Sequence, residues 1–113
     1  MTQLTTHVLD TMRGRPAAGI NIEIYRKESQ DWIKVGTMIT NRDGRTDNAL
    51  LQGSEFKIGK YQLIFYVGAY FEQSEDPSFL DDIVIRFGLN DPQSHIHVPL
   101  LVSPYSFSSY RGS

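Results

Sequence analysis

Apolar and polar residues alternate at every second position through several short runs of this chain. In the first run, Leu4, Thr6 and Val8 alternate with Thr5, His7 and Leu9. Successive side chains of a β-strand point to opposite faces, so such runs predict strands with one buried face. Further runs cover residues 20–25, 32–39, 61–67, 83–87 and 96–100. We therefore expect an all-β fold, as a sandwich or a barrel.

Turn-forming residues separate these runs. Residues 13–16 read Arg-Gly-Arg-Pro, and Asn41–Gly44 joins an Asn and an Asp to a glycine that can adopt positive φ. One short helix is also predicted. Asp76 would be its N-cap and Pro77 its first residue, with residues 78–82 as its body.

Length, charge and cysteine content narrow the function classes. The chain has 113 residues, which suits a single domain over residues 1–113. Its net charge of -2, without a basic cluster, argues against a nucleic-acid or membrane partner. It has no cysteine, which excludes disulfides and thiolate chemistry and suits a reducing compartment. No signal-peptide pattern or long apolar segment is present, so we expect a cytoplasmic protein.

The three histidines are the first candidates for chemistry. His95 and His97 are two residues apart on a predicted strand, so both imidazoles share the face opposite Ile96 and Val98. By the same argument His7 points away from the core. A solvated strand face explains this pattern, and so do general acid–base catalysis and a three-histidine zinc site with an open fourth position.

Arg45 and the end of the chain are the remaining candidates. Arg45 follows the Asn41–Gly44 turn, and its guanidinium is suited to binding carbonyls and anions, although a solvated arginine would also fit there. Residues 104–113 contain three aromatic residues and Arg111, which predicts a docked rather than a frayed end. Docking would bring the hydroxyl and terminal carboxylate of Ser113 close to the sheet.

Four segments together resemble one family over nearly the whole chain. They are Leu4–Asp10, Thr40–Arg45, the stretch from Gly59 to Phe71, and the segment from His95 through Pro104 to the terminal Tyr-Arg-Gly-Ser. The chain is similar to the 5-hydroxyisourate hydrolases, relatives of transthyretin. The terminal tetrapeptide after a His-x-His-Val-Pro strand is the most specific feature. Ile96 departs from the tyrosine that is frequent in the family, with little expected effect because Ile96 should face the core.

The resemblance implies a fold, an assembly and a site. The fold would be a transthyretin-like β-sandwich of two four-stranded sheets with one short helix. The assembly would be a homotetramer, a dimer of dimers, with active sites at subunit interfaces. The catalytic residues would be His7, Arg45, His97 and Ser113, and Tyr110 and Arg111 would join them in binding substrate.

The implied reaction is hydrolysis of 5-hydroxyisourate to 2-oxo-4-hydroxy-4-carboxy-5-ureidoimidazoline, in urate breakdown. Water attacks a ring carbonyl and the ring amide opens, without a metal or organic cofactor. His97 would be the base, shared with or held by His7, and Arg45 would stabilise negative charge. His95 would be secondary. The alternative is a transthyretin-like carrier of a small ligand that catalyses nothing.

Overall fold

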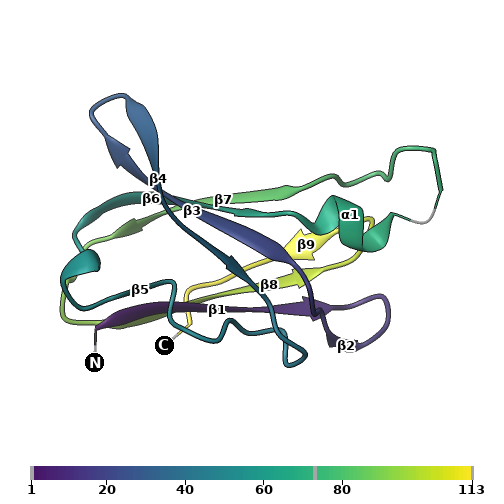
Figure 1. Ribbon diagram of the computed structural model, residues 1–113, viewed down its shortest axis with the longest axis horizontal. Coiled ribbons are helices and arrows are strands. Elements are labelled where there is room, and N and C mark those ends of the chain that lie inside the picture. Colours follow the sequence, from purple (N-terminus) through teal and green to yellow (C-terminus); the bar gives the residue numbers. More distant parts are fainter. Residues whose placement is uncertain (1, 73, 113) are drawn as a thin grey trace.

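The chain forms two β-sheets that lie one above the other around a common core. The computed structural model describes residues 2–72 and 74–112. Both termini of the described chain lie at the same end of the molecule (Figure 1). The expected all-β sandwich is confirmed.

The lower sheet in Figure 1 is built on two long strands. β1 (Gln3–Asp10) pairs in parallel with β8 (His95–Val102), and β9 (Phe107–Ser108) pairs with the other edge of β8. β2 (Arg15–Pro16) and β5 (Leu51–Gln52) take opposite ends of the free edge of β1. The sheet therefore contains five strands but is at most four strands wide, as the expected four-stranded sheet requires.

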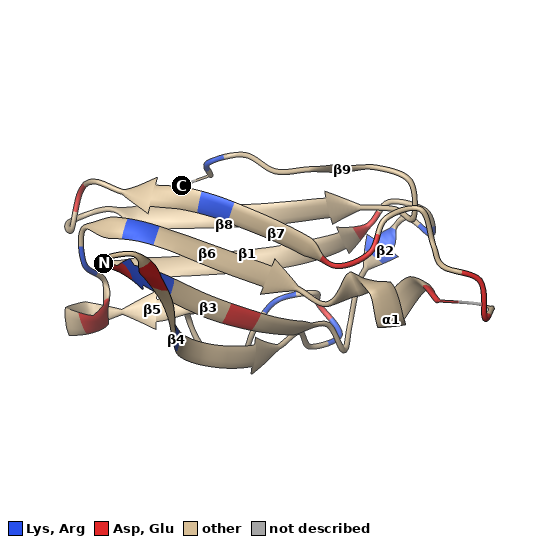
Figure 2. Cartoon of the chain, turned by 90° about the horizontal axis from the view of Figure 1, so that it is seen from above, with Lys and Arg blue, Asp and Glu red and all other residues tan. Residues whose placement is uncertain are grey.

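The upper sheet is antiparallel throughout, in the order β4-β3-β6-β7. Its strands are β3 (Asn21–Glu28), β4 (Asp31–Ile39), β6 (Gly59–Phe65) and β7 (Ile83–Leu89). Charged residues of both signs occur along its strands (Figure 2).

The core lies between the sheets and follows the predicted alternation. Leu4, Thr6 and Val8 of β1 are buried, and Ile96, Val98 and Leu100 of β8 are buried opposite the second sheet. The core residues of the upper sheet and its connections include the following: Ile22, Ile24, Tyr61, Leu63, Phe65, Val67 and Ile83. Because alternate positions are buried, the side chains between them point to the outer face of each strand, where they can contact a ligand or solvent.

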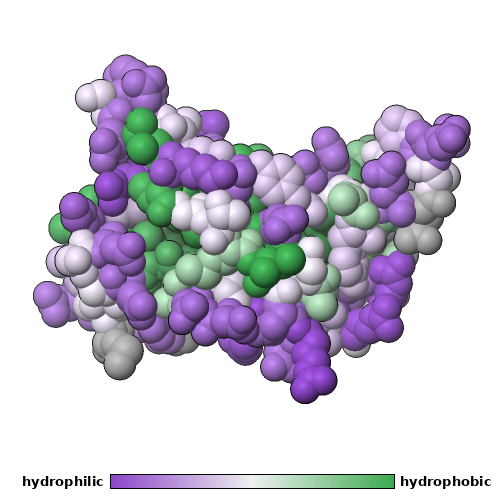
Figure 3. Space-filling model, in the orientation of Figure 1, coloured by the Kyte–Doolittle hydropathy of each residue, from purple (hydrophilic) through white to green (hydrophobic). Residues whose placement is uncertain are grey.

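The predicted burial of β4 is only partly right. Val35 packs against the core, but Ile33 and Ile39 are 43% and 56% exposed. β4 is an edge strand, and the β3–β4 hairpin rises beyond the second sheet (Figure 1). Apolar side chains reach the surface below this hairpin (Figure 3).

The predicted helix over residues 76–82 is wrong. That segment has no helical turn, and the one α-helix among the described residues is α1 (Val67–Phe71), close after β6. Val67 and Phe71 lie four residues apart and both are buried, whereas Phe79 in the predicted segment is 75% exposed. A short helix needs such a buried face, because its own hydrogen bonds do not stabilise it.

Asp82, expected in the body of the helix, instead supports α1 from outside. Its Oδ1 accepts a hydrogen bond from the Gly68 N–H at 3.0 Å. A 3-10 helix covers Gly53–Glu55. Among the described residues, no helix has the length and apolar character needed to cross a membrane.

Candidate functional site

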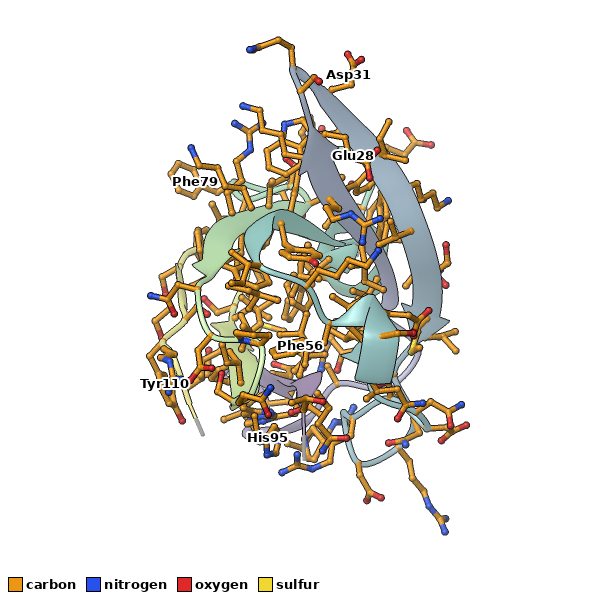
Figure 4. The ribbon with its side chains drawn as sticks, turned by 90° about the vertical axis from the view of Figure 1, so that its left-hand side faces the viewer. Glu28, Asp31, Phe56, Phe79, His95 and Tyr110 are labelled. Atoms are coloured by element: carbon orange, nitrogen blue, oxygen red, sulfur yellow. The ribbon has the colours of Figure 1, made fainter. Side chains whose placement is uncertain are left out.

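The parallel pairing of β1 and β8 brings the three histidines onto one outer face. Thr5 is the register partner of His97, and His7 is the partner of Pro99. Because core residues occupy the alternate positions on both strands, all these side chains point away from the core. Figure 4 shows His95 on the outer side of this sheet, on the side away from the β3–β4 hairpin tip that carries Asp31.

His7 and His97 form a direct pair. His7 Nδ1 and His97 Nε2 lie 2.7 Å apart, and the two rings are nearly parallel, with centroids 4.9 Å apart. Which nitrogen donates depends on the tautomers. Both rings are half-buried.

The hydrogen bonds continue from this pair through Thr5 to the third histidine. Thr5 Oγ1 lies 2.8 Å from His97 Nδ1 and 3.2 Å from His95 Nε2. Both ring nitrogens of His97 are thus engaged. Within residues 2–72 and 74–112, the side-chain hydrogen bond of His7 is made by Nδ1, and none involves its Nε2.

Arg45 reaches the same face because a tight turn presses against β1. Asn41 Oδ1 accepts hydrogen bonds from the N–H groups of Asp43 and Arg45, which confirms the predicted turn. Gly44 has φ +75°, and a Cβ there would lie 2.5 Å from the Val8 carbonyl oxygen, so only glycine fits. Arg45 then forms an antiparallel bridge directly opposite His7.

Burial and charge keep the histidine pair neutral. Burial, followed by the charges of His7, Arg45 and His95, lowers the pKa of His97 to about 4. Burial, followed by the charge of Arg45, also lowers the pKa of His7. Near pH 7 both rings are therefore uncharged, so one ring donates and the other accepts in the bond between them.

The docked end of the chain borders the pair on its other side, as predicted. Gly112 and His97 exchange two backbone hydrogen bonds, of 2.7 and 3.1 Å. The register that links β9 to this bridge sets Tyr110 opposite Pro99, on the same outer face as His97. Ser113 lies outside the described residues.

Arg111 alternates with Tyr110 and belongs to the other face of this segment. It lines a cavity of about 410 Å³ together with Phe87 of β7 and Val98 of β8, and Tyr110 borders the same cavity. The backbone trace therefore brings together His7, His97, Arg45 and Tyr110, and places Arg111 at the open edge between the sheets.

The arrangement suits proton transfer better than metal binding. In the described part of the chain, no group of three or more His, Cys, Asp or Glu residues is placed to hold a metal ion. The imidazole nitrogens of His7 and His97 point at each other rather than at a common point. A neutral imidazole with a free nitrogen beside a guanidinium can take a proton from water and stabilise an oxyanion.

Sequence reasoning gave Thr5 no role and ranked His95 as secondary. A signal for Thr5 was available, because it lies two residues before His7 and must share its face. No local signal reveals that its hydroxyl meets two imidazoles from a strand about 90 residues away.

Comparisons with known proteins match this chain to one family over nearly its whole length. The model of the HIUase/Transthyretin family matches residues 4–112. The 5-hydroxyisourate hydrolase of Pseudomonas aeruginosa is 51% identical over 117 residues, which cover 100% of this chain and 93% of the relative.

Solved structures share the fold over the whole chain. A 5-hydroxyisourate hydrolase from Klebsiella pneumoniae is 31% identical with a TM-score of 0.82, and the match covers 100% of both chains. An (S)-allantoin synthase is 45% identical with a TM-score of 0.91; the match covers 99% of this chain, which spans only 44% of that longer one. Transthyretin from Sparus aurata, 24% identical, matches with a TM-score of 0.88 over 99% of this chain and 97% of its own, a likeness of fold.

Proposed function

This chain belongs to the HIUase/Transthyretin family, and on that ground we propose that it is an enzyme that hydrolyses 5-hydroxyisourate in urate breakdown. The observation that carries the proposal is the neutral His7–His97 pair beside Arg45 on one strand face. The product is 2-oxo-4-hydroxy-4-carboxy-5-ureidoimidazoline.

The pair divides the work of the general base. His97 has both ring nitrogens in hydrogen bonds, so it reaches the attacking water through His7. His7 Nε2 removes a proton from water as the oxygen attacks the ring carbonyl, and His97 accepts the Nδ1 proton of His7. The lowered pKa values keep both rings unprotonated and ready at neutral pH.

Arg45 supplies the positive charge that the reaction needs. The guanidinium binds the attacked carbonyl and stabilises the negative charge that develops on its oxygen. The C–N bond of the ring amide then breaks, and the nitrogen takes back the proton that left the water. No metal or organic cofactor enters this scheme.

The end of the chain completes the substrate site. Tyr110 lies on the same face as His97, so it borders the bound ring, and Arg111 anchors the terminal segment. Gly112 is hydrogen-bonded to His97, and we propose the hydroxyl or terminal carboxylate of Ser113, the next residue in the sequence, as a further contact to substrate or water.

We also propose the homotetramer, a dimer of dimers, with sites at the subunit interfaces. The site lies on an outer sheet face where Arg45 and His95 are exposed, so one copy does not enclose a small substrate. Light scattering tests the assembly, and a monomer would contradict it. The cysteine-free composition supports the proposed cytoplasmic location, which cell fractionation would test.

The deciding experiment follows freshly generated 5-hydroxyisourate by ultraviolet absorbance, with and without the protein. We expect loss of substrate well above its spontaneous decay, and decay at the spontaneous rate with His97→Asn. A folded parent protein that leaves the decay unchanged would contradict the proposal and favour the carrier, which equilibrium binding of small aromatic ligands would then test.

A further inference from the structure

The hydrogen bonds of the His7–His97 pair do not end at the pair. They pass from His97 Nδ1 to the hydroxyl of Thr5 at 2.8 Å and on to His95 Nε2 at 3.2 Å. We propose that Thr5 and His95 form the outer half of a proton relay that links the reacting water to solvent. The inference rests on the proposed hydrolase function and extends it to two residues that function does not use.

Every group in this row can both give and accept a proton. A neutral imidazole has one donor and one acceptor nitrogen, and a threonine hydroxyl has one donor hydrogen and free lone pairs. In one state His7 donates to His97, His97 to Thr5, and Thr5 to His95. In the other state all three hydrogen bonds run in the opposite direction. The row therefore has two complete arrangements, which differ by the passage of one proton.

The neighbouring residue shows that this use of a hydroxyl is not the default on β1. Thr6 is buried, and its hydroxyl donates to the Val98 carbonyl oxygen at 2.5 Å, a bond within the sheet. Thr5 is only partly buried, and within the described residues its hydroxyl is hydrogen-bonded to two imidazoles rather than to backbone.

The charges around the His7–His97 pair favour moving a proton away from it. Among the described residues, the ionisable groups that act on His97 are His7, Arg45 and His95. The positive charge of Arg45 repels a second positive charge, so protonation of His7 or His97 is energetically unfavourable. His95 is exposed, and a proton delivered to it is shared with solvent.

The step is balanced along the row. The O–H bond of water breaks and its proton binds His7 Nε2. The Nδ1 proton of His7 moves to His97 Nε2, the Nδ1 proton of His97 moves to Thr5 Oγ1, and the Thr5 hydroxyl proton moves to His95 Nε2. The electron pair of the water O–H bond forms the new bond to the carbonyl carbon. Reversal of the row returns one proton to the leaving nitrogen.

The test uses the full-length protein and compares Thr5→Val with Thr5→Ser on 5-hydroxyisourate. Valine keeps the shape of threonine without its hydroxyl, so we expect kcat to fall by about 10- to 100-fold with KM nearly unchanged. Serine restores the hydroxyl and most of kcat. Thr37→Val is the matched control, because Thr37 is an exposed strand residue of the other sheet, and it should keep the parent kcat.

A solvent-isotope measurement separates a relay from mere positioning of His97. In mixtures of H₂O and D₂O, the parent kcat should depend on deuterium content as expected for several moving protons. In Thr5→Val the relay ends at His97, so the dependence should fall to that of the two protons that pass from water to His7 and from His7 to His97. A second variant, His95→Ala, should lose kcat and recover part of it when free imidazole is added to the buffer.

Each result decides between defined alternatives. A parent protein without activity overturns the proposed function, and the relay with it. An active parent with a Thr5→Val variant at parent kcat overturns the relay alone, as does Thr5→Ser failing to restore kcat. If Thr5→Val does not fold, His95→Ala decides the matter, and full activity without imidazole overturns the relay.

Discussion

The outer faces of the two sheets both carry polar side chains at alternate positions. On the upper sheet these side chains are paired with one another, whereas on the lower sheet they include neutral histidines beside an arginine. On the upper sheet, Glu23 accepts hydrogen bonds from Tyr25, Tyr66 and Lys34 at 2.8, 2.6 and 2.9 Å. These bonds, that from Tyr66 first, lower the pKa of Glu23 to about 2. The Glu23 carboxylate thus has three hydrogen-bond partners, in a sheet whose strands carry charged residues of both signs (Figure 2).

On the lower sheet the polar groups are left ready to react. His7 and His97 are neutral, and among the described residues no carboxylate forms an ion pair with Arg45. A solvated face gains from pairing its charges, whereas a reactive face needs a charge without a partner and a base without a proton. The alternation of the sequence is the same in both sheets, so partner chemistry distinguishes the two faces.

The largest effect expected from breaking this contrast is that of His7→Asn. In the proposed mechanism His7 Nε2 takes the proton from water, so kcat/KM of this variant should fall by at least about 100-fold. The melting temperature should stay near that of the parent, because the ring points outward from the core. Initial rates with 5-hydroxyisourate measure the first quantity, and a rate above half the parent value would contradict the assignment.

Asp10→Ala tests the inner face of the same strand. The Asp10 side chain is fully buried and accepts hydrogen bonds from Arg13, from the Tyr70 hydroxyl and from the Met12 N–H. Removal of the carboxylate leaves these donors without an acceptor, so the free energy of unfolding should fall by about 3 kcal/mol in urea titrations. Asp31→Ala, at the exposed tip of the β3–β4 hairpin (Figure 4), is the control that should change little.

Arg45→Gln should separate catalysis from electrostatics within the site. Loss of the charge should lower kcat/KM by about 10- to 100-fold. It should also raise the pKa values of His7 and His97, because the Arg45 charge helps to lower both, second to burial for His7. Titration of the imidazole protons by NMR measures this rise. Unchanged imidazole pKa values would place Arg45 too far away to act as proposed.

The pH dependence should report the histidine pair directly. Activity should hold at neutral pH and be lost in acid as His7 and His97, whose pKa values both lie below 6.5, become protonated; His97 does so at about 4. Stability has a defined sign. The folded pKa of His97 lies below the unfolded value of 6.5, so the unfolded chain binds protons first. Stability is therefore lost as pH falls from 6.5 to about 4.

Urea titrations at several pH values measure this loss, and His97→Asn is the control for carboxylates that titrate in the same range. The difference in unfolding free energy between parent and variant should change across this window and be constant below it. A constant difference at every pH would contradict the lowered pKa.

The smallest effect is expected on the upper sheet. Glu23→Gln removes a partly buried charge whose hydrogen-bond partners all lie outside the histidine site, so kcat/KM should stay within about twofold of the parent. The melting temperature should fall slightly at neutral pH, and the difference should vanish only near pH 2, where Glu23 itself becomes protonated. A large loss of activity would mean that the two faces are not independent.

Several parts of the site could be predicted from the sequence because they depend on local geometry. The outward direction of His7, His95 and His97 follows from strand alternation, and the turn before Arg45 follows from Asn41–Gly44. The helix prediction at 76–82 failed, since a cap and a proline do not replace a buried face.

What the sequence by itself determined is which face each side chain takes and where the chain turns. The tertiary structure alone decided that β1 lies parallel to β8 in a register that sets Thr5 beside His97. A shift of that register by two residues would keep every core residue buried, yet it would part His7 Nδ1 from His97 Nε2. Alternation has a period of two and so cannot choose among such registers. The packing of the core and the pairing of the last residues with β8 select one register. That register brings together His7 and His97, which are 90 residues apart in the sequence.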